Sequence, residues 1–167
     1  VEETSYAYDG AAVTVSYTVD GIDGEGTEAS GITLIGGNTA DVEFVDIYKL
    51  GTVKFTKAGL YKESCAEDPD DVKMLDGVEF ALYEGTDTEC ENPVMTATSV
   101  NGVVTFKDLK IGTYLVKESK TIGDYIIDNT VYTAEVTEAN IDTYAVLNGV
   151  QDNTLINDLP RTDLKIE

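Results

Sequence analysis

Three short segments of alternating apolar and polar residues place a lysine, a glutamate and an asparagine on faces that should be buried. They are Lys57 in the run 53–57, Glu118 in the run 114–118 and Asn157 in the run 155–159. Successive side chains of a strand point to opposite faces, so each shares a face with apolar neighbours if these runs are strands. Because an unpaired buried charge is costly, we expect the three side chains to contact one another. An amine, an acid and a carboxamide that meet in a dry core can form an amide bond.

The sequence as a whole predicts an all-β protein. Short runs rich in Val, Tyr, Thr and Ile are expected to be strands, namely 53–57, 78–83, 94–100, 103–106, 113–118, 131–136, 143–147 and 154–157. Asn101-Gly102 and Asn148-Gly149 are turn signals. Regular short strands separated by turns indicate a β-sandwich.

The first fifty residues are organised differently. They hold two alternating runs, 12–19 and 41–48, and the glycine-rich acidic stretch 20–31, which we interpret as a loop. Two strands cannot close a sandwich, so we expect residues 1–50 to be the C-terminal part of a preceding domain. A complete domain is expected over 51–160. The start without methionine also suggests a fragment.

Composition excludes several classes of function. The chain has 32 acidic and 11 basic residues and a formal net charge of -21, which argues against a nucleic-acid partner. It has no histidine, so His-based catalytic triads and His metal sites are excluded. The acidic stretches 20–25 and 68–71 lack EF-hand spacing. We therefore expect no metal and no cofactor. No apolar run is long enough to insert into a membrane.

The two cysteines, Cys65 and Cys90, each lie in a polar stretch between strand patterns. Paired loop cysteines are typical of an extracellular disulfide, and we favour a Cys65–Cys90 bond over two free exposed thiols.

Residues 51–159 resemble the collagen-adhesin B-type domains, also called Cna-B or SpaA-like domains, of Gram-positive surface adhesins and pilins. The run 75–83 resembles the family pattern L-x-G-x-x-F-x-L-Y, and 102–118 resembles its block G-x-x-x-F-x-x-L-x-x-G-x-Y-x-x-x-E, which ends in Glu118. The runs 51–57 and 154–158 resemble its first and last strands. The resemblance covers about two thirds of the chain and implies an immunoglobulin-like or prealbumin-like β-sandwich.

The resemblance also implies a function. Lys57 and Asn157 would form an intramolecular isopeptide bond, with Glu118 donating a proton to the amide oxygen or shuttling protons as ammonia leaves. The bond forms once, so the chain would not be an enzyme in the ordinary sense. We expect a structural stalk or shaft module of a secreted, cell-wall-anchored or pilus-associated surface protein, with neighbouring domains as partners. The alternative for the three residues is a buried Lys–Glu pair hydrogen-bonded to the asparagine.

The opening segment matches the same family pattern in part. Glu3 resembles another glutamate motif, and Asp46 resembles the acceptor of another last strand. We take them as a candidate second site whose lysine must come from outside this chain, because Lys49 lies after the acceptor and off its face. Leu159-Pro-Arg-Thr-Asp163 resembles a sortase signal but lacks its glycine, so we interpret 161–167 as a junction to a following domain.

Two other functions stay open from the sequence. One is a ligand-binding adhesin module, with host or surface ligands contacting the long acidic loop expected over 58–77. The other is a conventional β-sandwich enzyme, for which we find no nucleophile–base pair, metal cluster or phosphate-binding loop.

Overall fold

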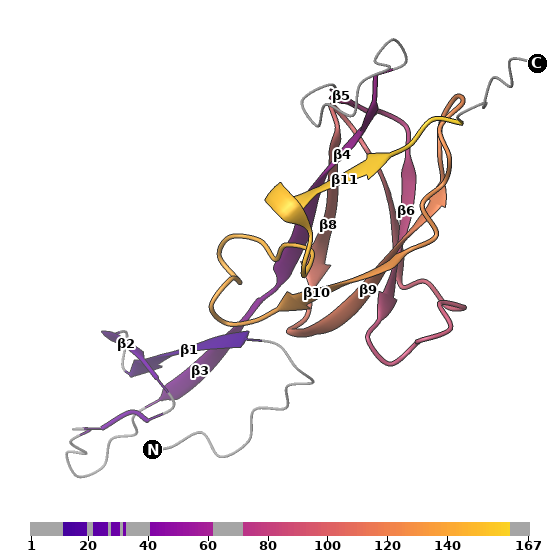
Figure 1. The fold of residues 1–167 in the computed structure, drawn as a ribbon. Helices are drawn as coiled ribbons and strands as arrows, with labels where there is room; N and C mark the ends of the chain where they lie inside the picture. Colours follow the sequence, from indigo (N-terminus) through magenta and orange to yellow (C-terminus); the bar gives the residue numbers. More distant parts are fainter. Residues whose placement is uncertain are drawn as a thin grey trace, which may run out of the picture. The chain divides into compact units, whose positions relative to one another are not determined.

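The computed structural model describes residues 12–19, 22–26, 28–30, 32, 41–61 and 72–160. The chain divides into two compact units, Val1–Leu50 and Gly51–Glu167. The regular elements in both are strands, apart from the short 3-10 turn η1 (Gln151–Asn153) (Figure 1). Within these ranges, no helix has the length and hydropathy needed to cross a membrane. The all-β class predicted from the sequence is confirmed.

The first unit contains a three-stranded antiparallel sheet in the order β2-β1-β3. Its strands are β1 (Ala12–Val19), β2 (Ile22–Glu25) and β3 (Val42–Lys49). The sequence predicted β1 and β3 but placed β2 in a loop, and that interpretation was wrong. β2 carries Gly and Asp, which disfavour strands, and its Ile22 is exposed, so no apolar pattern marks it. Backbone pairing with β1 holds it in place.

The second unit is a sandwich of two four-stranded sheets. One sheet has the order β10-β9-β6-β7; in the other, β4 pairs with β11, β5 and β8. The strands are β4 (Gly51–Leu60), β5 (Val72–Met74), β6 (Glu79–Glu84), β7 (Met95–Thr98), β8 (Val103–Leu109), β9 (Gly112–Lys120), β10 (Val131–Val136) and β11 (Thr154–Asn157). The predicted β-sandwich is confirmed.

The first and last strands of this unit are neighbours, and they run parallel (Figure 1). Thr56 of β4 pairs with Val103 of β8 on one side and with Thr154 of β11 on the other. Along the parallel pair, Lys57 is in register with Leu155, and Gly59 with Asn157. The strand that begins the unit and the strand that ends it are therefore hydrogen-bonded neighbours in one sheet.

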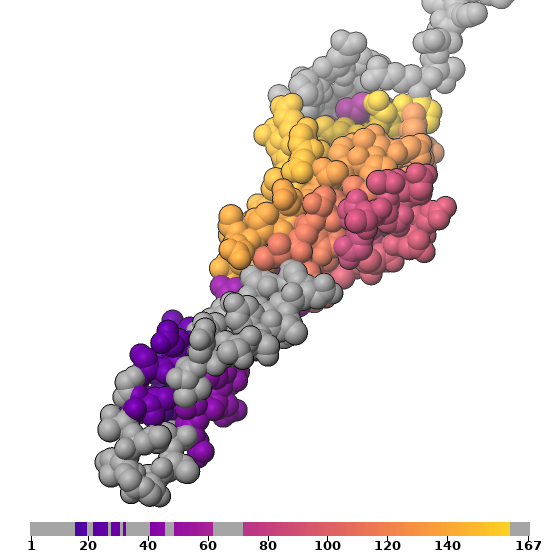
Figure 2. Space-filling model, turned by 90° about the horizontal axis from the view of Figure 1, so that it is seen from below, coloured from indigo at the N-terminus to yellow at the C-terminus, as the bar shows by residue number. Residues whose placement is uncertain are grey.

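The core lies between the two sheets, where alternation sends the apolar faces inward. On β4, Val53 and Phe55 are buried whereas Lys54 is exposed. The Phe55 ring meets the Phe80 ring of β6 edge-on, with 5.0 Å between centroids, so the two sheets interlock through aromatic contacts. In the space-filling view, the orange residues, which precede η1 in the sequence, adjoin the yellow residues of η1 and β11 on the surface of this unit (Figure 2).

The strand predicted over 143–147 is absent, although its alternation is real. Ala145 and Leu147 are buried, and Tyr144 and Val146 are exposed. Ala145, however, forms a bridge with Val53 of β4, whereas Leu147 forms one with β10 in the other sheet. The segment crosses from one sheet to the other, so neither bridge extends into a ladder.

The loop predicted over 58–77 was too long at both ends. β4 continues through Leu60, and Val72–Met74 forms β5 against it. The ladder continues past Lys57 because Ala58 and Gly59 are buried despite their weak strand propensity. Residues 62–71 lie outside the described part of the chain, so a ligand-binding role for this segment stays a prediction.

The Asn101-Gly102 turn joins strands of different sheets. Both residues have positive φ, 50° and 72°, as a tight hairpin turn requires. Val100 and Val103 form an isolated bridge beside the turn. Away from the turn the two strands separate, since β7 pairs with β6 and β8 pairs with β4. The second turn signal, Asn148-Gly149, is also a turn, and Gly149 has a φ of 73°. Both turn predictions are confirmed.

Candidate functional site

Lys57 extends from β4 into the core of the sandwich. It is 0% exposed, and its Nζ donates to Asn157 Oδ1 at 2.5 Å and to the Leu155 carbonyl oxygen at 3.4 Å. The same atom lies 3.4 Å from Glu118 Oε2 and 6.0 Å from the centroid of the Phe80 ring. The amine is thus enclosed by an amide, a carboxyl group and an aromatic face.

Glu118 and Asn157 approach this amine from different sheets. Glu118 comes from β9, and Asn157 is the last residue of β11; they are 2% and 1% exposed. Asn157 Nδ2 donates to Glu118 Oε1 at 2.7 Å and to Thr121 Oγ1 at 3.0 Å. The structure therefore brings together Lys57, Glu118 and Asn157, the three residues that the alternation pattern selected.

Hydrogen-bonding capacity explains how the Asn157 carboxamide is oriented. A protonated lysine can only donate and an ionised carboxylate can only accept. The carboxamide oxygen therefore faces Lys57 and its nitrogen faces Glu118. In the reverse orientation the amide nitrogen would face the Lys57 amine, donor against donor, and the amide oxygen would face the Glu118 carboxylate, acceptor against acceptor. Glu118 Oε2 accepts no hydrogen bond from the described residues, and it is directed at the Lys57 amine as an ion-pair partner.

Burial makes the Lys57 amine more nucleophilic. Removal from water lowers the pKa of Lys57 from its ordinary value of 10.5, whereas the Glu118 carboxylate and, more weakly, Asp128 act in the opposite direction. The balance is a lowered pKa, so the neutral amine is easier to reach than in an exposed lysine. A neutral amine has the lone pair needed to attack a carbonyl carbon.

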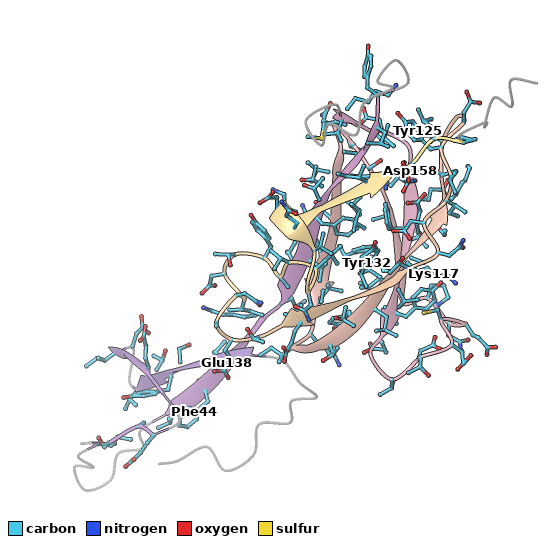
Figure 3. The ribbon with its side chains drawn as sticks, in the orientation of Figure 1. Phe44, Lys117, Tyr125, Tyr132, Glu138 and Asp158 are labelled. Carbon is cyan, nitrogen blue, oxygen red and sulfur yellow. The ribbon has the colours of Figure 1, made fainter. Side chains whose placement is uncertain are left out.

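Sequence reasoning missed three polar residues near this site: Thr121, Asp128 and Tyr132. Tyr132 Oη donates to Asp128 Oδ2 at 2.6 Å, and burial together with this carboxylate raises the pKa of Tyr132 to about 12. Tyr132 lies on β10, the strand beside β9 (Figure 3). Thr121 and Asp128 lie in the connection between β9 and β10, where alternation gives no facing, so no sequence signal marked them.

The other predicted sites are only partly described. Cys90 is half-buried against Ala81, Tyr83 and Leu115, and it is a free thiol within the described ranges. Cys65 lies outside the described residues, so the disulfide stays a prediction. Where the chain is described, no group of three or more acidic or cysteine side chains could hold a metal ion.

The candidate second site is also undetermined. Asp46 belongs to β3, where its backbone pairs with Val15 of β1. Glu3 lies outside the described residues. Their predicted proximity stays a prediction.

Comparison of the fold with solved structures finds Gram-positive pilins. The minor pilin GBS52 of Streptococcus agalactiae matches with a TM-score of 0.50 and 16% identity, over 92% of this chain and 63% of that one. The major pilin subunit BcpA of Bacillus cereus matches with a TM-score of 0.47 and 15% identity, over 93% and 41%. The T6 backbone pilin of serotype M6 Streptococcus pyogenes matches with a TM-score of 0.45 and 19% identity, over 64% of this chain and 20% of that one. The chain spans less than two thirds of each of these structures.

The likeness to GBS52, at 16% identity, shows a shared fold alone. No curated protein sequence matches the chain. The model of the SpaA family, described as a prealbumin-like fold domain, matches residues 66–150, which is half of the chain. The matched stretch includes Glu118 and six of the eight strands of the sandwich. The chain therefore belongs to the SpaA family of prealbumin-like fold domains.

Proposed function

We propose that this chain is a structural module of a Gram-positive surface adhesin or pilin, locked by an isopeptide bond between Lys57 and Asn157. The observation that carries the proposal is the buried contact of Lys57 Nζ with Asn157 Oδ1 at 2.5 Å, next to Glu118. Contact between an amine and a carboxamide replaces a bimolecular encounter with proximity. An ion pair between Lys57 and Glu118 with a purely structural role would not need a carboxamide that is hydrogen-bonded to both partners.

The chemistry balances without any other reactant. The neutral Lys57 Nζ attacks Asn157 Cγ, a new C–N bond forms, and the bond from Cγ to Nδ2 breaks. One proton must pass from Nζ to Nδ2, which then leaves as ammonia. Glu118 is positioned to carry it, because Oε2 lies 3.4 Å from Nζ and Oε1 accepts from Nδ2 at 2.7 Å. These contacts favour proton shuttling over donation to the amide oxygen, which faces Lys57 instead.

The position of the bond suits a module that bears load. β4 and β11 are parallel neighbours, so the unit's entry at Gly51 and its exit after Asn157 lie at opposite ends of one strand pair. Pulling on the two ends would shear that pair. A bond across it transfers the load directly and shields the intervening chain, since the linked residues are 100 apart in sequence.

Single-molecule pulling on the whole chain tests this role. An unlinked Asn157→Ala variant should release its second unit with a gain of roughly 350 Å, at about 3.5 Å per extended residue. The wild-type chain should not show that extension at forces that unfold the variant. Equal extension of both proteins would refute the load-bearing role.

We further propose that the protein is extracellular and anchored to the cell wall or associated with a pilus, with neighbouring domains of the same surface protein as its main partners. Crosslinking happens once per molecule, so the reaction matures the protein and is not enzymatic turnover. The support is the family membership together with the buried triad. Surface labelling of intact cells that express the whole protein tests the location.

For the first unit we propose a second crosslink, from Asp46 to a lysine outside this chain, with Glu3 assisting. The support is the sequence pattern, together with the placement of Asp46 on a strand paired over its whole length with β1. A longer chain that includes the upstream residues should lose one water for this bond, because the acceptor is an acid. A longer chain that loses only ammonia would contradict it.

A further inference from the structure

Thr121 contacts the atom that has to leave. It follows β9, which ends at Lys120, and its Oγ1 accepts a 3.0 Å hydrogen bond from Asn157 Nδ2. The crosslinking reaction proposed for Lys57, Glu118 and Asn157 does not use this hydroxyl. Because the hydroxyl is hydrogen-bonded to the reacting carboxamide, it is placed to take part in the reaction.

The two N–H groups of the carboxamide are both engaged. One donates to Glu118 Oε1 at 2.7 Å and the other to Thr121 Oγ1, while the oxygen accepts from Lys57. Three partners in different directions fix the plane of the amide. A fixed plane keeps the face of the carbonyl carbon turned to the same attacking amine.

Thr121 is also where this closed site meets solvent. Lys57, Glu118 and Asn157 are 0%, 2% and 1% exposed, and Leu155, whose carbonyl accepts from Lys57, is 3% exposed. Thr121 is half-buried and so is in contact with water. Beyond the contacts among themselves, the three side chains have two hydrogen-bond partners in the described part of the chain, the Leu155 carbonyl and Thr121. The leaving nitrogen of Asn157 contacts Thr121, which is the more exposed of the two.

We propose that Thr121 is a catalytic residue of the crosslinking reaction, which holds the leaving nitrogen of Asn157 and gives ammonia its way to solvent; this inference rests on the proposed isopeptide bond. A hydroxyl can accept from the planar amide nitrogen and, by rotation, donate to its lone pair once the carbon is tetrahedral. The proton that completes ammonia still comes from Lys57 through Glu118. Thr121 ends the reaction with the proton it began with.

The test follows crosslinking as the chain is made. The whole chain is synthesised in a short cell-free pulse. Samples are taken at successive times and quenched in denaturant, and their intact mass is measured by mass spectrometry. Thr121→Val keeps the shape and removes the hydroxyl, so ammonia loss should be about tenfold slower, the effect of one hydrogen bond on a rate. Thr121→Ser keeps the hydroxyl and should stay close to the wild-type rate. Thr98→Val, on the exposed face of β7, is the matched control and should not change the rate.

Each outcome separates the two claims. If the wild-type chain keeps its full mass, the isopeptide bond fails and this inference fails with it. If the wild-type chain reacts and Thr121→Val reacts equally fast, the bond stands and the role of Thr121 is refuted. Equal slowing by Thr121→Val and Thr121→Ser would assign the effect to packing and also refute it. Should Thr121→Val not fold by circular dichroism, Thr121→Ala against Thr121→Ser isolates the hydroxyl, and equal rates would overturn the inference.

Discussion

Glu118 Oε1 accepts a 2.7 Å hydrogen bond from Asn157 Nδ2, the nitrogen that an isopeptide bond would expel. The other oxygen of the same carboxyl group lies 3.4 Å from the Lys57 amine. One side chain thus spans the atom that must lose a proton and the atom that must gain it. This relationship supports the proposed transfer of a proton from Lys57 to the leaving nitrogen of Asn157.

Replacing Glu118 by glutamine should stop crosslinking while keeping the size of the side chain. A carboxamide cannot carry the proton from Lys57 to Asn157, so the purified variant should keep its full mass. It should also lose stability, because closing a 100-residue loop is worth about 5 kcal/mol in the chain-entropy account.

Glu79→Gln is the matched control for this change. Glu79 also lies on a strand of the sandwich, but its ion pair with Lys120 is exposed, and such pairs contribute little. This variant should crosslink fully and unfold like the wild type. Complete ammonia loss in Glu118→Gln would show that the carboxyl group has another role.

The crosslinking rate should depend on pH through Lys57. Burial lowers the pKa of this amine from 10.5, with Glu118 opposing part of the shift. A lowered pKa means that the neutral, reactive amine is populated at lower pH than in an exposed lysine. The rate of ammonia loss after a cell-free pulse should therefore rise with pH and level off below pH 10.5. A rate that continues to climb beyond that pH would contradict the account.

Gly59 lies opposite Asn157 in the parallel pair and has no room for a side chain. A Cβ there would come within 2.4 Å of Tyr125 Cε1 and 2.8 Å of Leu75 Cδ1. Gly59→Ala should displace Tyr125, whose hydroxyl donates to the Leu60 carbonyl oxygen at 2.8 Å. We expect a loss of about 1–3 kcal/mol in the free energy of unfolding, measured by denaturant titration.

The control for that change is Gly112→Ala, since a Cβ at Gly112 meets nothing within 4 Å. Its free energy of unfolding should change by no more than about 0.5 kcal/mol. Equal effects of the two substitutions would mean that the tight contact with Tyr125 is not what matters. Figure 3 shows Tyr125 near the end of β11, on the same side of the unit as Asp158.

The cysteines give an independent prediction about the cellular compartment. If Cys65 and Cys90 form the predicted disulfide, neither thiol should react with a labelling reagent until a reductant is added. Cys90 is half-buried against Tyr83 and Leu115, so this thiol is the one whose labelling the structure can be compared with. Rapid labelling of both thiols in folded, unreduced protein would rule the disulfide out.

Alternation predicted the site because the three residues lie within regular strands. Lys57 and Glu118 share faces with buried neighbours on β4 and β9, so their direction follows from period two alone. Thr121 could not be found in this way, because it lies past the end of β9, where no period applies. Its role depends on how the connection to β10 folds back toward Asn157.

The errors in the fold have a similar origin. β2 is held by backbone pairing and carries an exposed isoleucine at Ile22, so its side chains show no buried face. The segment 143–147 shows the opposite case, since Ala145 and Leu147 alternate correctly but contact different sheets. Side-chain pattern reports burial, and it does not report which strand a backbone pairs with.

Intact mass of the folded, purified chain tests the central claim most directly. The account predicts a mass lower than the sequence by one ammonia. A tryptic digest should then contain one branched peptide, with residues 55–62 joined to residues 121–161 through Lys57 and Asn157. Folded protein of full mass, whose digest is cleaved after Lys57 to give 55–57 and 58–62 and contains 121–161 as a separate peptide, would contradict the account.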